Sequence, residues 1–420
     1  MSETLYPPSM PRRLALCGEC DWVVRLPERQ PGQRAHCPRC HHHLTGTARR
    51  DAQAPMACAI AALIMLGLVF AFPFLGFSTH GVGHVMNFGD TAKALVGDDY
   101  GVLAVVLLAT TVAFPGLYLV TLVYVCLGAG ARQLPGAIPL ARLLRPLEPW
   151  MMSDVFIVGV LVSLIKIVSL ADIHIRASFI AFCIYSLLLL RTLTLIDWAA
   201  LWDAIAPVPA PDAPVHAGAS GQSQALVACR ACETPFTINH RHRCPRCGKR
   251  HHVFRVDRIQ LTWALLVTAS LLYIPANIYP VLSTTTLGHS RPQTIAAGVL
   301  HLAESGDWPI AAVIFVASIM VPVSKIVALA WLCIAARGRP DASLARTRAY
   351  RLTEKIGRWS MIDVFVVAVL ATLVQAGALM SIEPGPGAIA FAGVVILTMI
   401  AALTFDTRLL WPDAAPNDAS

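Results

Sequence analysis

Long uncharged apolar blocks constrain the fold of this chain more than any other feature. A helix of about 20 apolar residues spans the ~30 Å hydrocarbon layer of a bilayer. Blocks of this kind cover residues 56–76, 101–128, 153–173, 177–197, 260–281, 309–335, 360–382 and 386–405. Only 14% of the residues are charged, whereas soluble domains average about 25%. We therefore predict an all-α polytopic membrane protein with eight transmembrane helices.

Lysine and arginine are distributed unevenly between the segments that join these helices. Segments 1–55, 129–150, 198–257, 336–358 and the tail from residue 406 together hold 26 of them. The opposite set of segments holds only Lys93, Arg176 and Arg291. Because basic residues accumulate on the cytoplasmic side, both termini are predicted to be cytoplasmic. The net charge of +8 is explained by this topology and by anionic inner-leaflet lipid, so nucleic-acid binding is not predicted.

Eight of the twelve cysteines form four CxxC pairs, all in segments predicted to be cytoplasmic. The pairs are Cys17/Cys20, Cys37/Cys40, Cys229/Cys232 and Cys244/Cys247. A CxxC knuckle directs two thiolates at one point, and two knuckles complete a tetrahedral four-cysteine site. The reducing cytosol favours thiolate–metal bonds over disulfides. We predict two structural zinc ribbons with about two Zn²⁺ per chain. A rubredoxin-like iron site, a redox switch, or ligands from the histidines at 41–43 and 251–252 are the alternatives.

The sequence also repeats itself. The tetrapeptide CPRC occurs at Cys37–Cys40 and again 207 residues later, and two prolines of the first half recur at the same spacing. The segment WMMSDVF then matches WSMIDVF at a spacing of 209 residues. The repeat-motif positions singled out are Trp150, Asp154, Trp359, Asp363, Pro280 and Pro322. The repeat predicts two tandem units of one ribbon and four helices, and an even number of helices gives both units the same orientation.

The predicted domain boundaries follow from this repeat. They are an N-terminal ribbon at 1–55, a first membrane repeat at 56–205, a linker at 206–224, a second ribbon at 225–257, a second membrane repeat at 258–408 and a short tail at 409–420. The linker is rich in Pro, Ala, Gly and Ser, a composition typical of flexible to semi-extended segments.

Ionisable residues inside a predicted span are costly and are therefore candidates for function. Lys166 lies in the third span and Lys325 in the sixth, and their counterparts in the other half are Gln375 and Tyr118. We expect both lysines to face the bundle interior, near polar groups such as Ser324 and Gln375. There a lysine can hold an anionic headgroup as a point charge. A purely structural polar pair is the alternative.

The repeat-motif positions have structural interpretations as well. The two aspartates open the third and seventh predicted helices, where an aspartate caps backbone amides and suits the helix dipole. The two tryptophans beside them are expected to be interfacial anchors. The prolines are expected to kink or end helices, because proline lacks the amide proton that a helix interior needs.

These motifs together resemble the paraquat-inducible protein A family. The resemblance covers nearly the whole chain and rests on the two double-CxxC modules, on PANIYPVL from Pro275 to Leu282, and on the W-x-M-x-DVF motif from Trp359 to Phe365. It implies a location in the inner membrane of a Gram-negative bacterium. It also implies a role in moving phospholipid between the inner and outer membranes with a periplasmic partner that carries mammalian-cell-entry (MCE) domains. The first half departs from these motifs, so the halves need not contribute equally.

Enzyme activity is not predicted, because the sequence contains no Walker, GxSxG or HExxH motif. A lipid-transport subunit is the preferred function. The alternatives are a proton-coupled or small-solute secondary transporter and a membrane-bound redox or metal sensor in the envelope stress response. Solute uptake into liposomes by the isolated protein would favour the transporter, and zinc release under oxidant would favour the sensor.

Overall fold

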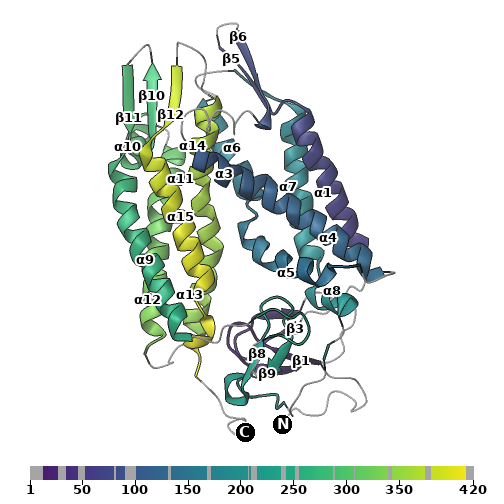
Figure 1. Cartoon of the computed structure of the whole chain (residues 1–420). Coiled ribbons are helices and arrows are strands. Elements are labelled where there is room, and N and C mark those ends of the chain that lie inside the picture. Colours follow the sequence, from purple (N-terminus) through teal and green to yellow (C-terminus); the bar gives the residue numbers. More distant parts are fainter. Residues whose placement is uncertain are drawn as a thin grey trace.

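The chain forms two helical units that lie side by side, with small sheets at one end and the cysteine-bearing segments at the other (Figure 1). This computed structural model describes residues 13–26, 35–45, 53–79, 82–89, 101–130, 134–167, 172–206, 208–209, 215–237, 243–250, 255–286, 289–306, 308–338, 343–373 and 380–412.

The first helical unit contains four groups of elements. In chain order they are α1 (Gln53–Ala71), β5 (Leu75–Thr79) and β6 (Val82–Met86); α3 (Gly101–Leu108), the π-helical turn η1 (Ala109–Ala113) and α4 (Phe114–Gly130); α5 (Ala137–Leu147), the 3-10 turn η2 (Glu148–Trp150) and α6 (Ser153–Ile167); and β7 (Asp172–Ile175), α7 (Ala177–Leu195) and α8 (Trp198–Ile205).

The second unit has closely similar elements in the same order. They are α9 (Arg255–Ile278), β10 (Leu282–Thr286) and β11 (His289–Gln293); α10 (Ile295–Glu304), α11 (Trp308–Phe315), the π-helical turn η4 (Val316–Met320) and α12 (Val321–Ala335); α13 (Ser343–Gly357), the 3-10 turn η5 (Arg358–Met361) and α14 (Ile362–Leu373); and β12 (Met380–Pro384), α15 (Pro386–Thr404) and the 3-10 turn η6 (Thr407–Leu410). The π-helical turns lie 207 residues apart.

Seven helical segments among the described residues are long and apolar enough to cross a membrane. They are Gln53–Ala71, Gly101–Gly128, Ala137–Ile165, Ala177–Leu195, Arg258–Ile278, Ala311–Ala335 and Pro386–Thr404. The remaining predicted span, 360–382, contains α14, and its residues 374–379 lie outside the described part of the chain. The protein is therefore a mostly helical, multi-pass membrane protein.

Each unit carries at one end a three-stranded antiparallel sheet that was not predicted. The predicted spans 56–76, 153–173 and 360–382 were too long, because their last residues belong to strands β5, β7 and β12. The strand orders are β6-β5-β7 and β11-β10-β12. Leu75 pairs with Ile175 in the first sheet, and Leu282 pairs with Pro384 in the second. Each sheet thus joins the loop after the first helix of its unit to the loop before the last, which satisfies backbone amides at this end of the bundle.

The two units meet along α6 and α14, which are equivalent helices of the repeat pattern. Phe156 and Phe365 are 209 residues apart, and their rings meet edge to face with centroids 5.6 Å apart. Ser163 Oγ donates to the backbone oxygen of Val366 at 3.4 Å. A residue that contacts its own counterpart marks the axis of a twofold-like interface. The two units thus meet at residues that occupy matching positions in their sequences.

Gly159 allows the close approach at this seam. A Cβ atom built on it would lie 3.0 Å from the Cβ of Phe365. Gly159→Leu should therefore lower the free energy of unfolding by about 1–3 kcal/mol, as overpacking does elsewhere. Gly67→Leu is the matched control, because a Cβ at Gly67 meets nothing within 4 Å. Thermal unfolding in detergent micelles measures both, and an equal loss in the two variants would contradict this seam.

Candidate metal centres and intramembrane site

Three of the four CxxC pairs lie in the turns of short antiparallel hairpins. The first joins β1 (Arg13–Leu16) to β2 (Val23–Leu26), the second joins β3 (Ala35–His36) to β4 (His43–Thr45), and the third joins β8 (Leu226–Ala228) to β9 (Pro235–Thr237). In all four knuckles the amide of the first cysteine donates to the oxygen five residues on, at 2.8–3.0 Å. The amide four residues on donates back to the oxygen of the first cysteine.

This double hydrogen bond requires a left-handed residue directly after the second cysteine. The four residues there are Asp21, His41, Glu233 and Gly248, with φ of 60°, 59°, 56° and 71°. Only the last is the glycine that this conformation favours. The other three knuckles hold an ordinary side chain in a sparsely populated conformation, which persists where the surrounding structure over-determines it.

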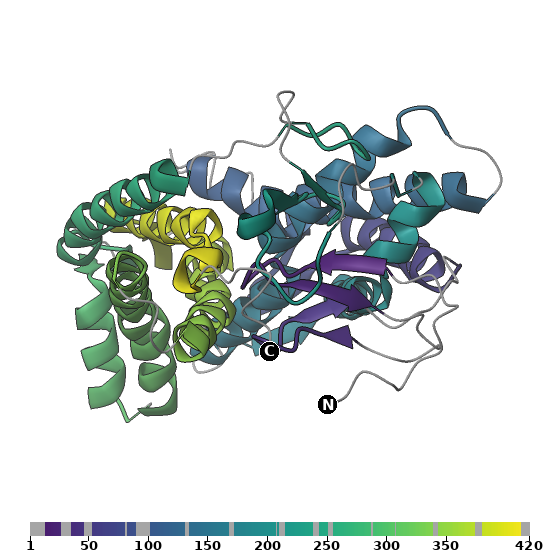
Figure 2. The same cartoon turned by 90° about the horizontal axis from the view of Figure 1, so that it is seen from below.

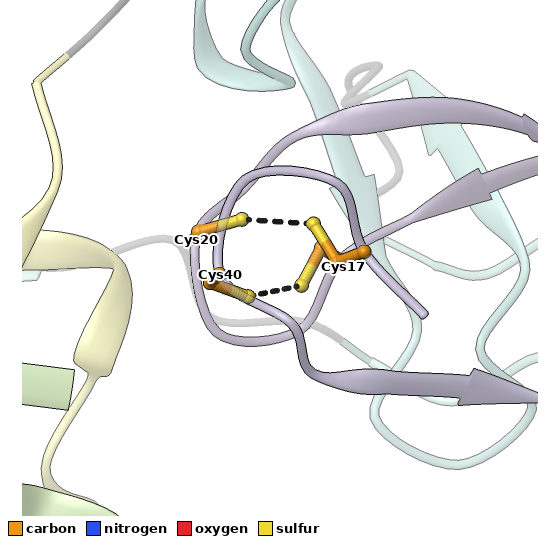
Figure 3. Close-up of side chains that lie close together, drawn as sticks. Cys17, Cys20 and Cys40 are labelled. Atoms are coloured by element: carbon orange, nitrogen blue, oxygen red, sulfur yellow. Dashed lines mark hydrogen bonds between the residues drawn. The ribbon is translucent and has the colours of Figure 1, made fainter. Parts of the chain in front are cut away.

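Each pair of knuckles brings four buried sulfurs together. Cys17 Sγ lies 3.5 Å from Cys40 Sγ, and Cys20 Sγ lies 3.5 Å from Cys37 Sγ (Figure 3). The second set repeats this arrangement, with 3.5 Å between the sulfurs of Cys229 and Cys247 and of Cys232 and Cys244. All ligand atoms within a set lie within 4.8 Å of one another.

These distances fit a tetrahedral metal–thiolate centre. Zn–S bonds of about 2.3 Å place the sulfurs of a tetrahedral site about 3.8 Å apart. Four thiolates this close repel one another strongly, so the arrangement calls for a cation between them. Within the described residues neither set includes a histidine. His42 instead pairs with Glu19 at 2.9 Å, and residues 251–252 lie outside the described part.

The first ribbon docks on the second helical unit rather than on the unit that follows it in sequence. Arg39, inside the first CPRC, donates to Pro412 O at 3.0 Å, and its guanidinium lies 4.9 Å from the Trp411 ring centroid. Arg351 on α13 donates to Glu19 Oε2 and Cys40 O, each at 2.9 Å. Burial alone would raise the pKa of Glu19, but hydrogen bonds from His42 and Arg351 lower it overall.

The second ribbon docks on the first helical unit in the same way. Arg246, inside the second CPRC, pairs with Asp203 on α8 at 2.6 Å and donates to Ala206 O at 2.8 Å. Arg145 on α5 pairs with Glu233 at 2.5 Å. The arginine of each CPRC thus holds the segment just after the last spanning helix of one unit. Each ribbon therefore docks on the unit that it does not directly precede in the sequence.

The two ribbons also bind each other through part of the 206–224 stretch. Val23 N donates to Ala219 O at 3.0 Å, and Gly221 N donates to Asp21 O at 2.7 Å. Leu16 and Leu226 share a small apolar cluster. Figure 2 shows the strands of both ribbons next to one another at this end of the molecule. The residues at 215–224 therefore lie against the first ribbon.

In both units a 3-10 turn separates two helices that pack into the bundle. In the second unit, Tyr350 OH on α13 donates to Ala402 O in the last turn of α15 at 2.9 Å. Gly357 ends α13 seven residues later, directly before the turn η5, which packs against α15. Seven helical residues advance about 10 Å, which places η5 beside the middle of α15. In the first unit, Ala137–Ile165 forms one candidate span that contains the turn η2.

Lys325 lies at the interruption in the second unit. Its side chain is 3% exposed, and a Cβ built on Gly357 would lie 2.9 Å from its Nζ. The ammonium therefore occupies the space that any residue other than glycine would fill. Ser318 in η4 and Ser360 in η5 are buried, and their hydroxyls have no hydrogen-bond partner within the described residues. The turns η4 and η5 are in contact.

At the equivalent position in the first unit, side-chain hydroxyls of the same unit satisfy the backbone oxygen that a proline leaves without a donor. Pro115 cannot donate to the oxygen of Thr111, and this oxygen instead accepts from Ser153 Oγ and Tyr185 OH, each at 3.3 Å. The equivalents of these two donors in the second unit are Ile362 and Val394, which carry no hydroxyl.

Tyr118 OH contacts Glu148 Oε1 at 3.4 Å, at the positions that correspond to Lys325 and Gly357. The tyrosine thus has a partner where the lysine of the second unit meets a glycine. Among the described residues of the two units, only the second unit has a buried lysine at this place. The two hydroxyls without a partner belong to the adjoining turns η4 and η5.

Other residues singled out from the sequence are not gathered at this place. Ser324 is exposed and donates to Val321 O at 2.9 Å, so it does not join the buried lysine. Lys166 belongs to the last turn of α6, and its side chain and Gln375 lie outside the described residues. Asp154 is exposed, whereas Asp363 is 8% exposed.

The remaining repeat-motif residues lie at breaks in helices. Trp150 and Trp359 belong to the 3-10 turns η2 and η5. Pro280 follows the end of α9, where its oxygen accepts from Gly387 N at 3.0 Å. Pro322 is the second residue of α12, directly after the π-helical turn.

Sequence reasoning missed Ser318, Ser360 and Gly357. The signals that point to them are present in the sequence. Pro322 frees the backbone four residues before it, at Ser318. Gly357 stands at the position of Glu148 in the repeat and next to the W-x-M-x-DVF motif, where a glycine indicates close approach of another group.

These features define a multi-pass membrane protein with two four-cysteine sets that could each hold a metal ion, and with breaks in its helices. The model of the family described as "Paraquat-inducible protein A" matches residues 52–206 and again 259–415. The chain therefore belongs to the paraquat-inducible protein A family. Each match covers one helical unit.

Relatives with assigned names cover nearly the whole chain. The "Intermembrane transport protein PqiA" of Escherichia coli is 43% identical over 399 residues, which are 94% of this chain and 95% of that protein. The "Probable intermembrane transport protein" of Haemophilus influenzae is 28% identical over 96% of this chain and 97% of its own length. The "Lipophilic envelope-spanning tunnel protein A" of Escherichia coli is 28% identical, over 94% and 90%. No solved structure matches the chain.

Two zinc ions per chain are the expected metal content, one in each four-cysteine set. Cys37→Ser combined with Cys40→Ser should remove one ion and leave the other set loaded, because the sets share no ligand. Inductively coupled plasma mass spectrometry on purified protein measures the ratio. Cys58→Ser, outside both sets, is the control. Iron instead of zinc, or loss of both ions in the double variant, would contradict this assignment.

Proposed function

We propose that this protein is the inner-membrane subunit of an intermembrane lipid-transport system. In this role it passes phospholipid to or from a periplasmic partner with MCE domains. The names of two relatives, an intermembrane transport protein and an envelope-spanning tunnel protein, support transport across the envelope. The system would need no catalytic residue in this chain, because the movement of lipid breaks no covalent bond.

The buried Lys325 is the observation that carries the proposal. A lysine at bilayer depth costs roughly 2.5–3.5 kcal/mol by insertion scales, so its retention needs a compensating role. A phospholipid headgroup brings a phosphate, and a lysine binds phosphate as a point charge. The hydroxyls of Ser318 and Ser360 would donate to the phosphate oxygens. The first unit, closed by its own hydrogen bonds, would act as the scaffold against which this site is held.

We further propose eight spanning helices in two tandem repeats of the same orientation, each built with one ribbon. The same order of elements in both units and the two separate matches of the family model support this arrangement. The ribbons would lie in the cytoplasm with structural zinc, and the two three-stranded sheets in the periplasm. The domain limits remain those drawn from the sequence. The uneven distribution of lysine and arginine supports this orientation.

The orientation predicts which introduced cysteines a membrane-impermeant maleimide reaches. Ser290→Cys, on the exposed strand β11, should be labelled in intact spheroplasts. Gln222→Cys, an exposed position beside the first ribbon, should be labelled only after the cytoplasmic side is opened. Mass spectrometry of the labelled peptides reads the result against the native cysteines. The reverse pattern would overturn the orientation.

Removing the charge of Lys325 should abolish transport while leaving the fold intact. Lys325→Met keeps the apolar stem, so expression and melting temperature should match the unchanged protein. Complementation of a strain that lacks the transport system should fall at least tenfold, since a charge-assisted contact of about 1.5–3 kcal/mol is lost. The same measurements are made on two comparison variants. These are Lys355→Met, at an exposed position of α13, and Lys166→Met. Full complementation by Lys325→Met would mean that the lysine is structural.

A further inference from the structure

The first ribbon contacts α13, and α13 packs against Lys325. This contact, called the brace below, can hold α13 in position beside the lysine. We propose that Arg351 is a positioning residue that couples the metal-loaded first ribbon to Lys325. The second ribbon has no such role. The functional consequence rests on the proposed lipid-transport site, whereas the coupling itself is a structural property that can be measured separately.

Arg351 bridges two knuckles that are far apart in sequence. Its guanidinium donates to Glu19, which lies within the knuckle Cys17–Cys20, and to the backbone oxygen of Cys40, which ends the other knuckle. The two knuckles belong to different hairpins, β1–β2 and β3–β4. The hairpins are joined by the four-cysteine site, by the His42–Glu19 pair at 2.9 Å and by the hydrogen bond from Arg39 to Cys20 O at 3.3 Å. Both acceptors of Arg351 therefore depend on the assembly of this site. The guanidinium of Arg351 can therefore make both hydrogen bonds only when the site is assembled.

The last residue of the same helix packs against the lysine. Arg351 and Gly357 both belong to α13, and six helical residues span about 9 Å. The space for the Cβ of Gly357 is already taken by the Nζ and Cε of Lys325, at 2.9 Å each. A small shift or fraying of α13 at Arg351 would thus change the packing around the ammonium. Because both residues belong to one short, continuous helix, a displacement at Arg351 reaches Gly357.

The remaining contacts of the first ribbon hold a different part of the second unit. Arg408 in η6 donates to Gly18 O at 3.2 Å and lies 3.5 Å from Asp21. Arg39 in the ribbon lies 4.9 Å from the Trp411 ring centroid and donates to Pro412 O at 3.0 Å. These contacts keep the ribbon attached when Arg351 is removed, so an Arg351 variant tests the brace without detaching the domain.

The second ribbon is anchored on the first helical unit instead. Within the described part of the chain, its ion pairs join Arg246 to Asp203 on α8 and Glu233 to Arg145 on α5. Emptying the second metal centre should therefore leave α13 unchanged. This asymmetry separates a specific coupling from general destabilisation of the protein by metal loss.

Hydrogen–deuterium exchange of the full-length protein in nanodiscs tests the coupling. In Arg351→Ala, amides of 343–357 should exchange about tenfold faster, the factor expected for losing a charge-assisted hydrogen bond. Both zinc ions should be retained. Cys37→Ser combined with Cys40→Ser should give the same local increase with one ion lost. Arg348→Ala, an exposed arginine on the same helix, and Cys244→Ser combined with Cys247→Ser should leave this segment unchanged.

Unchanged exchange of 343–357 in Arg351→Ala would overturn the proposal, as would an equal increase after loss of the second metal centre. Arg351→Lys restores the charge and should recover part of the protection, which a purely steric role would not give. Complementation is the second measurement. Faster exchange with normal transport would support the brace and count against Lys325 as the lipid site. If Lys325→Met loses transport but Arg351→Ala leaves the exchange of α13 unchanged, the result would support Lys325 as the lipid site and count against the brace.

Discussion

Backbone groups inside a hydrocarbon layer have no water to bond, so each break in a spanning helix must be satisfied by the protein itself. Both units contain two adjacent breaks, a π-helical turn before a proline and a 3-10 turn in the neighbouring helix. In the first unit, hydroxyls of Ser153 and Tyr185 bond the oxygen that Pro115 leaves free. In the second unit those donors are absent. The buried residues at its breaks are instead Lys325, Ser318 and Ser360.

In the proposed transport function, this difference gives the two units different roles. The first unit is closed by internal hydrogen bonds and joins the second along α6 and α14, where Phe156 meets Phe365. The second unit has a buried lysine and two hydroxyls without a partner among the described residues. The ribbons tie the units together from the metal-binding end, each docked through the arginine of its CPRC tetrapeptide. The repeat of that tetrapeptide therefore reflects docking as well as metal binding.

The sequence predicted the features that depend on composition and local spacing. Apolar length indicated the membrane helices, and CxxC spacing indicated both four-cysteine sets, because a knuckle is a local turn. Features that depend on long-range packing were not predictable in this way. The crossed docking of Arg39 onto Pro412 joins residues at opposite ends of the chain. From the sequence alone, Ser324 is as good a neighbour for Lys325 as Ser318, since which serine is buried depends on the helix rotation after the π-helical turn.

The central claim is that the break in the second unit, and not the equivalent break in the first, contacts lipid. A photo-crosslinking amino acid placed at Ser360 or at its counterpart Met151, in cells grown with radioactive phosphate, tests it most directly. We expect phospholipid to be captured at position 360, to be captured at least tenfold less at 151, and to be lost from 360 when Lys325 is changed to Met. Equal capture at the two positions, or none at 360, would contradict this claim.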